Sequence, residues 1–250
     1  MDNYFERARE LAPELVKTRR TIHQNPEIGM DVPKTSKYVF DQLVQLGYEP
    51  RYIGGTGVTA TVGRPGKTIL LRGDMDALPI NEESGLPFAS QNPGAAHCCG
   101  HDLHTAMLLG AAKLLKENEA QLKGTVKFMF QPGEEVLMGA RAMLDDGILE
   151  NPQVDAAMGI HVNSMVPCGA LIVFHGPTSA SATPLPSPST ERAVTEAVHM
   201  RASIPSPSSA TSIRRFSSSR RESWRPVRSV WSLSAVFMRE QSTMRSPVRL

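Results

Sequence analysis

The sequence predicts an α/β fold with a mixed, largely parallel central sheet flanked by helices. Within residues 1–176, short apolar runs typical of strands alternate with amphipathic segments typical of helices. Acidic or histidine residues follow directly after three of the strand-like runs. The composition then changes abruptly, so we assign this fold to residues 1–182 and treat residues 183–250 separately.

Two helices are predicted ahead of the sheet. The first covers residues 3–24, a charged segment with helical periodicity. The second lies within residues 34–50, where apolar residues recur near helical spacing and Gly47 is a candidate C-cap.

Four strands and two further helices follow along the chain. The strand segments are GVTATVG (57–63), KTILLRGDMD (67–76), GTVKFMFQPGEE (124–135) and DAAMGIHV (155–162). Between the second and third strands, residues 102–119 carry one apolar stripe with lysines and glutamates away from it. A shorter helix is expected within residues 136–149, before the fourth strand. This alternation is typical of a buried, largely parallel sheet.

The segment 183–250 is predicted to be a disordered tail. Residues 1–176 contain 16 lysines and arginines against 21 aspartates and glutamates, a net charge of −5. Residues 177–250 contain 11 arginines, no lysine and four glutamates, a net charge of +7. They also contain 18 serines and no glycine, the residue that turns with positive φ favour. We favour an out-of-frame origin over a basic nucleic-acid-binding arm, because such an arm usually contains lysine as well as arginine.

Composition also indicates where the protein works. No apolar run approaches the roughly 20 residues that span a bilayer, and the N-terminus lacks the pattern of a signal peptide. Only three cysteines are present, and the adjacent pair Cys98 and Cys99 would form a strained disulfide. We therefore expect a cytoplasmic protein without a membrane partner.

The candidate functional groups lie at consistent places in this pattern. They are Asp74 and Asp76, Glu134 and Glu135, and His161 after three predicted strands, with Cys99 and His101 just before a helix. In open α/β sheets functional groups gather at the carboxyl ends of strands. We therefore expect these side chains to meet at one edge of the sheet.

Sulfur, imidazole and carboxylate ligands together suit Zn²⁺ or another divalent transition ion. The candidate ligands are Cys99, His101, Glu135 and His161. If Glu135 binds the metal, Glu134 beside it is free to take a proton from water and pass it to a leaving amine. These groups are equipped for metal-assisted hydrolysis of an amide.

The motifs carrying these residues are IHQNPEIGM, LRGDMDALPI, HCCGHDLHTAMLLGAA, FQPGEE and GIHV, in this order. With them, residues 1–182 resemble the amidohydrolase branch of the aminoacylase/carboxypeptidase-like metallopeptidases, which includes hippurate hydrolases, N-acyl-amino-acid amidohydrolases and auxin-conjugate hydrolases. The resemblance implies a site for two divalent ions (Zn²⁺, Mn²⁺, Co²⁺ or Ni²⁺) that hydrolyses N-acyl or N-aroyl amino acids. It implies four metal ligands, Cys99, His101, Glu135 and His161, with Glu134 as general base and Asp76 supporting the site. Asp74 stands where relatives outside this branch carry a ligand histidine, and its role is left open.

The resemblance also implies a lid and dimerisation domain and a last ligand histidine, which are not recognisable in residues 183–250. We therefore expect this chain to have four of the family's usual five metal ligands and to lack the dimerisation surface. We expect its hydrolytic activity to be impaired. A non-catalytic metal-binding remnant and a basic-tailed nucleic-acid-binding protein are the alternatives, although we expect no nucleic-acid partner.

Neighbouring residues have two interpretations each. His97 and His104 either bind metal themselves or, as we favour, support the ligands or begin the helix, and Cys98 is a small residue beside Cys99 that does not bind metal. His23 and Asn25 either shape a loop beside the substrate or cap the preceding helix.

Overall fold

A computed structural model of the chain describes residues 3–164, 171–173 and 230–235. Its sheet has seven strands in the order β1-β2-β4-β3-β5-β7-β6. The strands are β1 (Arg51–Ile53), β2 (Gly57–Gly63), β3 (Thr68–Asp74), β4 (Thr125–Gln131), β5 (Ala156–Ile160), β6 (Leu171–Val173) and β7 (Val230–Ala235). The central pairings β4–β3, β3–β5 and β5–β7 are parallel, and the outer pairings are antiparallel. The predicted mixed α/β fold is confirmed.

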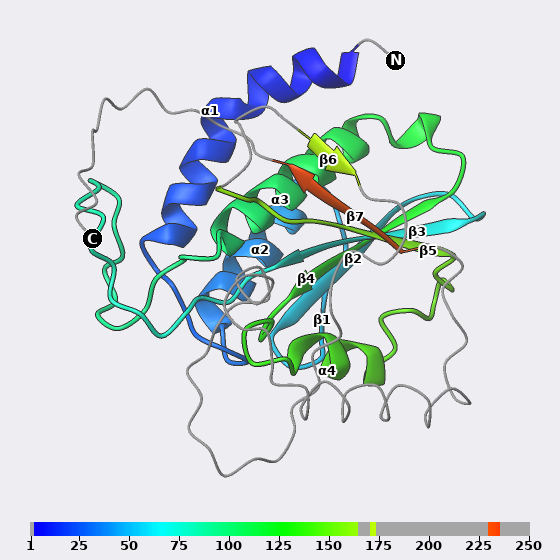
Figure 1. The fold of residues 1–250 in the computed structure, drawn as a ribbon. Coiled ribbons are helices and arrows are strands. Elements are labelled where there is room, and N and C mark those ends of the chain that lie inside the picture. The colour runs from blue at the N-terminus through cyan, green and yellow to red at the C-terminus, as the bar shows by residue number, and fades with distance from the viewer. Residues whose placement is uncertain (1–2, 165–170, 174–229, 236–250) are drawn as a thin grey trace, which may run out of the picture.

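Helices cover both faces of this sheet (Figure 1). They are α1 (Asn3–His23), α2 (Pro33–Gln45), α3 (His101–Glu117) and α4 (Gly139–Asp145), with a 3₁₀ turn η1 (Glu119–Gln121). The connection from β3 through α3 leads to β4, and the connection from β4 through α4 leads past β3 to β5. α3 and α4 pack in different core clusters on opposite faces, as the usual right-handed connection predicts when two connections run in different directions along a sheet. Such a reversal places a crevice at the carboxyl ends of the strands.

Alternation along β4 divides the core between the two faces. Phe128 and Phe130 are fully buried against α2 and α3, and Met129 between them packs with Met143 of α4 on the other face. Side chains of a strand point alternately to its two faces, so one apolar run fills both layers. This explains why β4 has a nearly continuous apolar sequence.

Close packing of α1 on α3 depends on a glycine. A Cβ atom at Gly110 would lie 2.9 Å from the terminal carbons of Leu15. The absence of a side chain therefore lets the two helices approach, which brings the C-terminal end of α1 beside the beginning of α3.

Most predicted elements are present, with differences at their ends. The C-cap of α2 is Leu46, and Gly47, the predicted C-cap, is the next residue and has φ +82°, as is common just past the end of a helix. α4 is shorter than the predicted helix 136–149, because residues 133–138 form a turn in which Leu137 has φ +57°. Strand β1 was not predicted, since three residues with one buried side chain carry too little periodicity.

Of residues 183–250, the structure describes only Val230–Ala235, which pairs in parallel with β5 and antiparallel with β6. The remainder of the predicted tail and the boundary at 182 lie outside the described residues. Within the described part of the chain, no helix combines the length and apolar character that a membrane span requires.

Candidate metal centre

The candidate centre lies where β3, β4 and β5 end and α3 begins. These strands are neighbours in the order β4-β3-β5 and run parallel, so their carboxyl ends share one edge. The side chains gathered there are Asp76, Cys99, His101, Glu134, Glu135 and His161. All six residues named from the sequence as catalytic or ligating are thus brought together.

His101 belongs to two groups of candidate ligands. Its Nε2 is 3.8 Å from Glu135 Oε1 and 3.9 Å from Glu134 Oε2. Cys99 Sγ is 3.5 Å from His161 Nε2. The candidate ligand atoms of Cys99, His101 and His161 lie within 4.8 Å of one another, as do those of His101 and the two glutamates.

Both histidines are oriented by hydrogen bonds from their other ring nitrogen. His101 Nδ1 donates to the Asp76 carbonyl oxygen at 2.8 Å, and His161 Nδ1 donates to the Val162 carbonyl oxygen at 2.6 Å. Each bond leaves the Nε2 lone pair directed toward the other candidate ligands. A backbone carbonyl fixing the second nitrogen is the usual arrangement for metal-binding histidine.

Two buried atoms of the centre test whether a cation fits. Among the described residues, His101 Nε2 and Glu135 Oε1 are buried without a hydrogen-bond partner. Buried polar atoms without partners are rare in folded proteins, because leaving one unpaired costs roughly 1–3 kcal/mol. A divalent ion would pair both atoms at once, and the sulfur, nitrogen and oxygen donors match the ligands of zinc. The donor set therefore fits a divalent ion.

Asp76 holds the acidic pair in place. Its carboxylate is fully buried and accepts hydrogen bonds from the backbone N–H of Glu134 at 2.9 Å and of Glu135 at 3.1 Å. Its carbonyl oxygen accepts the bond from His101. Asp76 therefore orients both the turn that follows β4 and His101, the first residue of α3.

The centre carries an excess of negative charge. Burial and the nearby charge of Asp74 raise the pKa of Glu134 to about 7. Burial would lower the pKa of His101, but the carboxylate of Asp74 and the bond to Asp76 hold it well above its ordinary value. A cation bound among these groups would offset the repulsion between the carboxylates.

The structure also shows one residue of the centre that sequence reasoning missed, Arg72. Arg72 forms an ion pair with Asp74, with Nη1 and Oδ2 2.8 Å apart, and Asp74 Oδ1 lies 2.5 Å from His104 Nδ1. Arg72 and Asp74 are two residues apart on β3, so strand periodicity could have placed them on one face. His104 follows His101 by three residues on α3, a spacing that predicts a shared helix face.

Asp102 is a second missed residue, and it lies outside the centre. It is fully buried and contacts Arg19 Nε at 2.6 Å and His23 Nδ1 at 2.7 Å. No local spacing predicts this cluster, because it depends on α1 packing against α3. Asn25 donates to the Thr21 carbonyl oxygen, which supports the interpretation of this residue as a helix cap.

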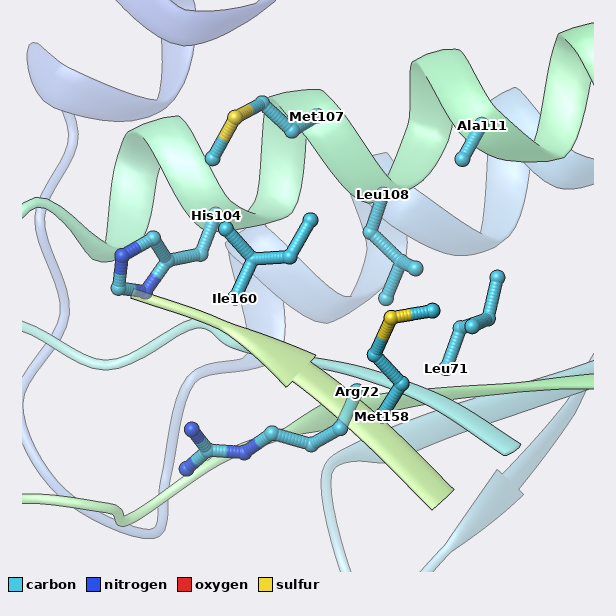
Figure 2. A pocket seen from close by; sticks show the side chains of 8 residues that line it. All are labelled: Leu71, Arg72, His104, Met107, Leu108, Ala111, Met158 and Ile160. Carbon is cyan, nitrogen blue, oxygen red and sulfur yellow. The ribbon is translucent and has the colours of Figure 1, made fainter. Parts of the chain in front are cut away.

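A small cavity lies between α3 and the strands β3 and β5, next to His104 and Arg72. Its volume is about 120 Å³. Its lining residues are Leu71, Arg72, His104, Met107, Leu108, Ala111, Met158 and Ile160 (Figure 2). Leu108 and Met158 point toward each other across it from α3 and β5. None of the described lining residues carries a carboxylate or a thiol, so Cys99, Glu134 and Glu135 lie outside this cavity.

A sequence profile of the family described as peptidase family M20/M25/M40 matches residues 70–225, more than half of the chain. The chain belongs to this family. The match confirms the resemblance inferred from the motifs, and it extends past residue 182 into the serine- and arginine-rich segment.

Relatives within the M20/M25/M40 family indicate the branch. The chain is 42% identical over 173 residues to an N-acetylcysteine deacetylase of Bacillus subtilis, covering 67% of this chain and 44% of that protein. It is 45% identical over 168 residues to IAA-amino acid hydrolase ILR1-like 4 of Arabidopsis thaliana, covering 66% of this chain and 38% of that protein. The chain therefore spans less than half the length of these curated relatives.

A solved structure of the M20 family gives the same assignment. A Bacillus subtilis protein described as a dinuclear metal-binding peptidase superposes with a TM-score of 0.65 at 41% identity. The match covers 68% of this chain and 48% of that one. The described fold is thus the fold of an M20 family member.

Proposed function

We propose that this chain is a metal-dependent amidohydrolase that cleaves N-acyl or N-aroyl amino acids into a carboxylate and a free amino acid. The observation that carries the proposal is the convergence of Cys99, His101, Glu135 and His161 beside the carboxylate of Glu134. We assign the first four as ligands of divalent ions (Zn²⁺, Mn²⁺, Co²⁺ or Ni²⁺), two in a complete site.

The substrate class rests on the relatives. N-acetylcysteine and an IAA-amino acid conjugate, the substrates that the names of two relatives state, both join an acyl group to the nitrogen of an amino acid. A small-molecule amide of this kind is therefore the substrate we propose, in preference to nucleic acid or a membrane surface.

When bound, the divalent ions would supply an acidified water and would polarise the carbonyl group of the amide. In this proposal, residues of the chain transfer the protons and position the acidic pair. Glu134 accepts a proton from the attacking water and delivers it to the amine nitrogen as the carbon–nitrogen bond breaks. Its carboxylate is 22% exposed, unlike the fully buried Asp76, so it can reach a substrate. Asp76 acts by positioning Glu134 and Glu135 through their backbone N–H groups.

We also propose that this chain hydrolyses its substrate slowly. Residues 183–250 contain no glycine and only one histidine, His199, and no motif of a lid or a last ligand is recognisable among them. The second candidate function, a metal-binding protein without catalysis, follows from the same observation. Among the described residues Cys98 and Cys99 are free thiols, and we propose a reducing compartment such as the cytoplasm.

The test is hydrolysis by the full chain loaded with Zn²⁺ or Mn²⁺. Release of free amino groups is measured from N-acetylcysteine, N-benzoylglycine and an indole-3-acetyl amino acid. We expect release from at least one of them, more slowly than by the Bacillus subtilis deacetylase assayed in parallel. We expect Glu134→Gln to lose about 100-fold or more of this rate, while the surface variant Glu117→Gln keeps it.

Two results would count against this proposal. Binding of zinc without hydrolysis would favour the non-catalytic candidate. A rate unchanged by Glu134→Gln would show that Glu134 is not the base.

A further inference from the structure

We propose that His104 is a positioning residue that fixes the candidate ligand His161 through the peptide groups of Val162, and that it does not bind metal itself. The inference rests on the proposed metal centre. It also gives Asp74 a role, which is to hold His104.

Both ring nitrogens of His104 take part in hydrogen bonds within the protein. Nε2 accepts the backbone N–H of Val162 at 2.9 Å, so this nitrogen carries a lone pair and the proton is on Nδ1. Nδ1 then donates to Asp74 Oδ1 at 2.5 Å. The ring is buried, with 2% of its surface exposed. His104 lies close enough to Asp74 and His101 to share an ion with them, but binding it through either nitrogen would break one of these two hydrogen bonds.

Val162 transmits this restraint to the candidate ligand. Its N–H is held by His104, and its carbonyl oxygen accepts the bond from His161 Nδ1. The rings of His104 and His161 also meet edge to face, with centroids 4.6 Å apart. The residue after β5 is therefore held at both of its polar groups, and His161 Nε2 is directed at Cys99 as a result.

The side chain of Val162 is held as well. A Cβ atom on Gly100 would lie 2.4 Å from Val162 Cγ2, so the valine packs directly on the glycine between Cys99 and His101. Movement of Val162 would disturb this contact along with the orientation of His161.

Asp74 is restrained in turn by groups on neighbouring strands. Arg72 Nη1 is 2.8 Å from Asp74 Oδ2, and Arg72 Nε donates to Gln131 Oε1 at 2.9 Å. The chain of contacts from Gln131 through Arg72, Asp74 and His104 to Val162 joins the ends of β4, β3 and β5. Asp74 thus supports the ligands in this chain, at the place where some relatives outside the branch carry a ligand histidine.

Residues that orient metal ligands commonly change metal affinity by 10–100-fold when they are replaced. We expect a loss of this size for His104→Leu, which removes both hydrogen bonds. Gln offers an amide donor and a carbonyl acceptor, so His104→Gln should recover part of the affinity. The matched control is His23→Leu, which removes a buried histidine that is also bonded to a buried aspartate but lies outside the centre.

The experiment is calorimetric titration of the metal-free full chain and its variants with Zn²⁺, after circular dichroism has shown that each variant is folded. In parallel, ¹⁵N spectra of the wild-type imidazoles are recorded with and without Zn²⁺. We expect the His101 and His161 Nε2 signals to shift on addition of zinc, while the His104 nitrogens keep the signature of an Nδ1–H ring. The spectra decide the question even if His104→Leu does not fold.

The outcomes separate the two proposals. Equal zinc affinity of wild type and folded His104→Leu, or a His104 Nε2 signal that reports coordination, overturns the inference about His104 alone. A wild-type chain that binds no zinc overturns the proposed function, and the inference with it.

Discussion

At the scale of single residues, Gly100 allows Cys99 and His101 to face one centre. Its φ of +83° lies in the left-handed region, and α3 begins at the next residue. A residue with a side chain would be strained there and would also collide with Val162. The backbone strain and the collision would both arise at Gly100, which lies between the candidate ligands Cys99 and His101.

We expect Gly100→Ala to lower the free energy of unfolding by about 1–3 kcal/mol, the usual cost of a left-handed non-glycine residue. We also expect weaker Zn²⁺ binding, since Val162 and therefore His161 must move. Urea denaturation and calorimetric titration measure the two effects. Gly94→Ala is the control, because Gly94 also has positive φ but has open space around its Cβ position. It should lower stability without changing zinc affinity, and equal zinc affinity in both variants would argue against the proposed restraint.

Residues of the centre differ in how far the sequence could predict them. Cys99, His101, Glu134 and Glu135 lie in short motifs next to predicted strands or helices, so local patterns were sufficient to select them. The links from Arg72 to Gln131 and from Asp102 to Arg19 join residues far apart in sequence. Such contacts depend on which strands are neighbours and on how α1 packs, and neither is encoded by local spacing.

At the scale of elements, a buried charged cluster connects the end of α1 to the first turn of α3. His23 Nδ1 is 2.7 Å from Asp102 Oδ2, and His23 Nε2 is 3.1 Å from Glu82 Oε1. Burial alone would lower the pKa of His23, but the two carboxylates outweigh it and raise that pKa above its ordinary value. The imidazolium form of His23 therefore stabilises the packing of the two helices.

This cluster predicts a pH dependence of stability. A histidine whose pKa is raised by folding stabilises the protein fully below its unfolded pKa of about 6.5, and the stabilisation is lost as pH rises through the folded pKa. We expect His23→Gln to cost more unfolding free energy at pH 6 than at pH 9. Urea denaturation of both proteins at the two pH values measures this difference. A cost that is constant or grows with pH would contradict the assignment.

The elements themselves were predicted best where their periodicity was long. α1, α2, α3 and the strands β2 to β5 each contain a clear apolar pattern, and they lie within a few residues of the predicted ranges. The predicted start of α4 was wrong. Leu137 has a positive φ, which is unusual for a leucine and cannot be predicted from the residue type. β1 depends on pairing with β2, which is a tertiary contact.

At the scale of the whole molecule, the centre exists because three parallel strands end at the same edge. The order β4-β3-β5 reverses the direction of chain progression at β3, and the reversal opens the edge to side chains from α3. The sequence predicted strands that end in acidic residues or histidine, and the described structure shows that these strands are neighbours.

The central claim is that Cys99, His101, Glu135 and His161 bind divalent metal. The most direct measurement is an anomalous difference map at the zinc absorption edge, from crystals of the full chain grown with Zn²⁺. We predict a zinc peak within about 2.0–2.3 Å of the ligand atoms of these residues, with His104 and Asp102 uninvolved. A map without zinc at these side chains, or with zinc bound instead by His104 or by the His23–Asp102 cluster, would contradict the account.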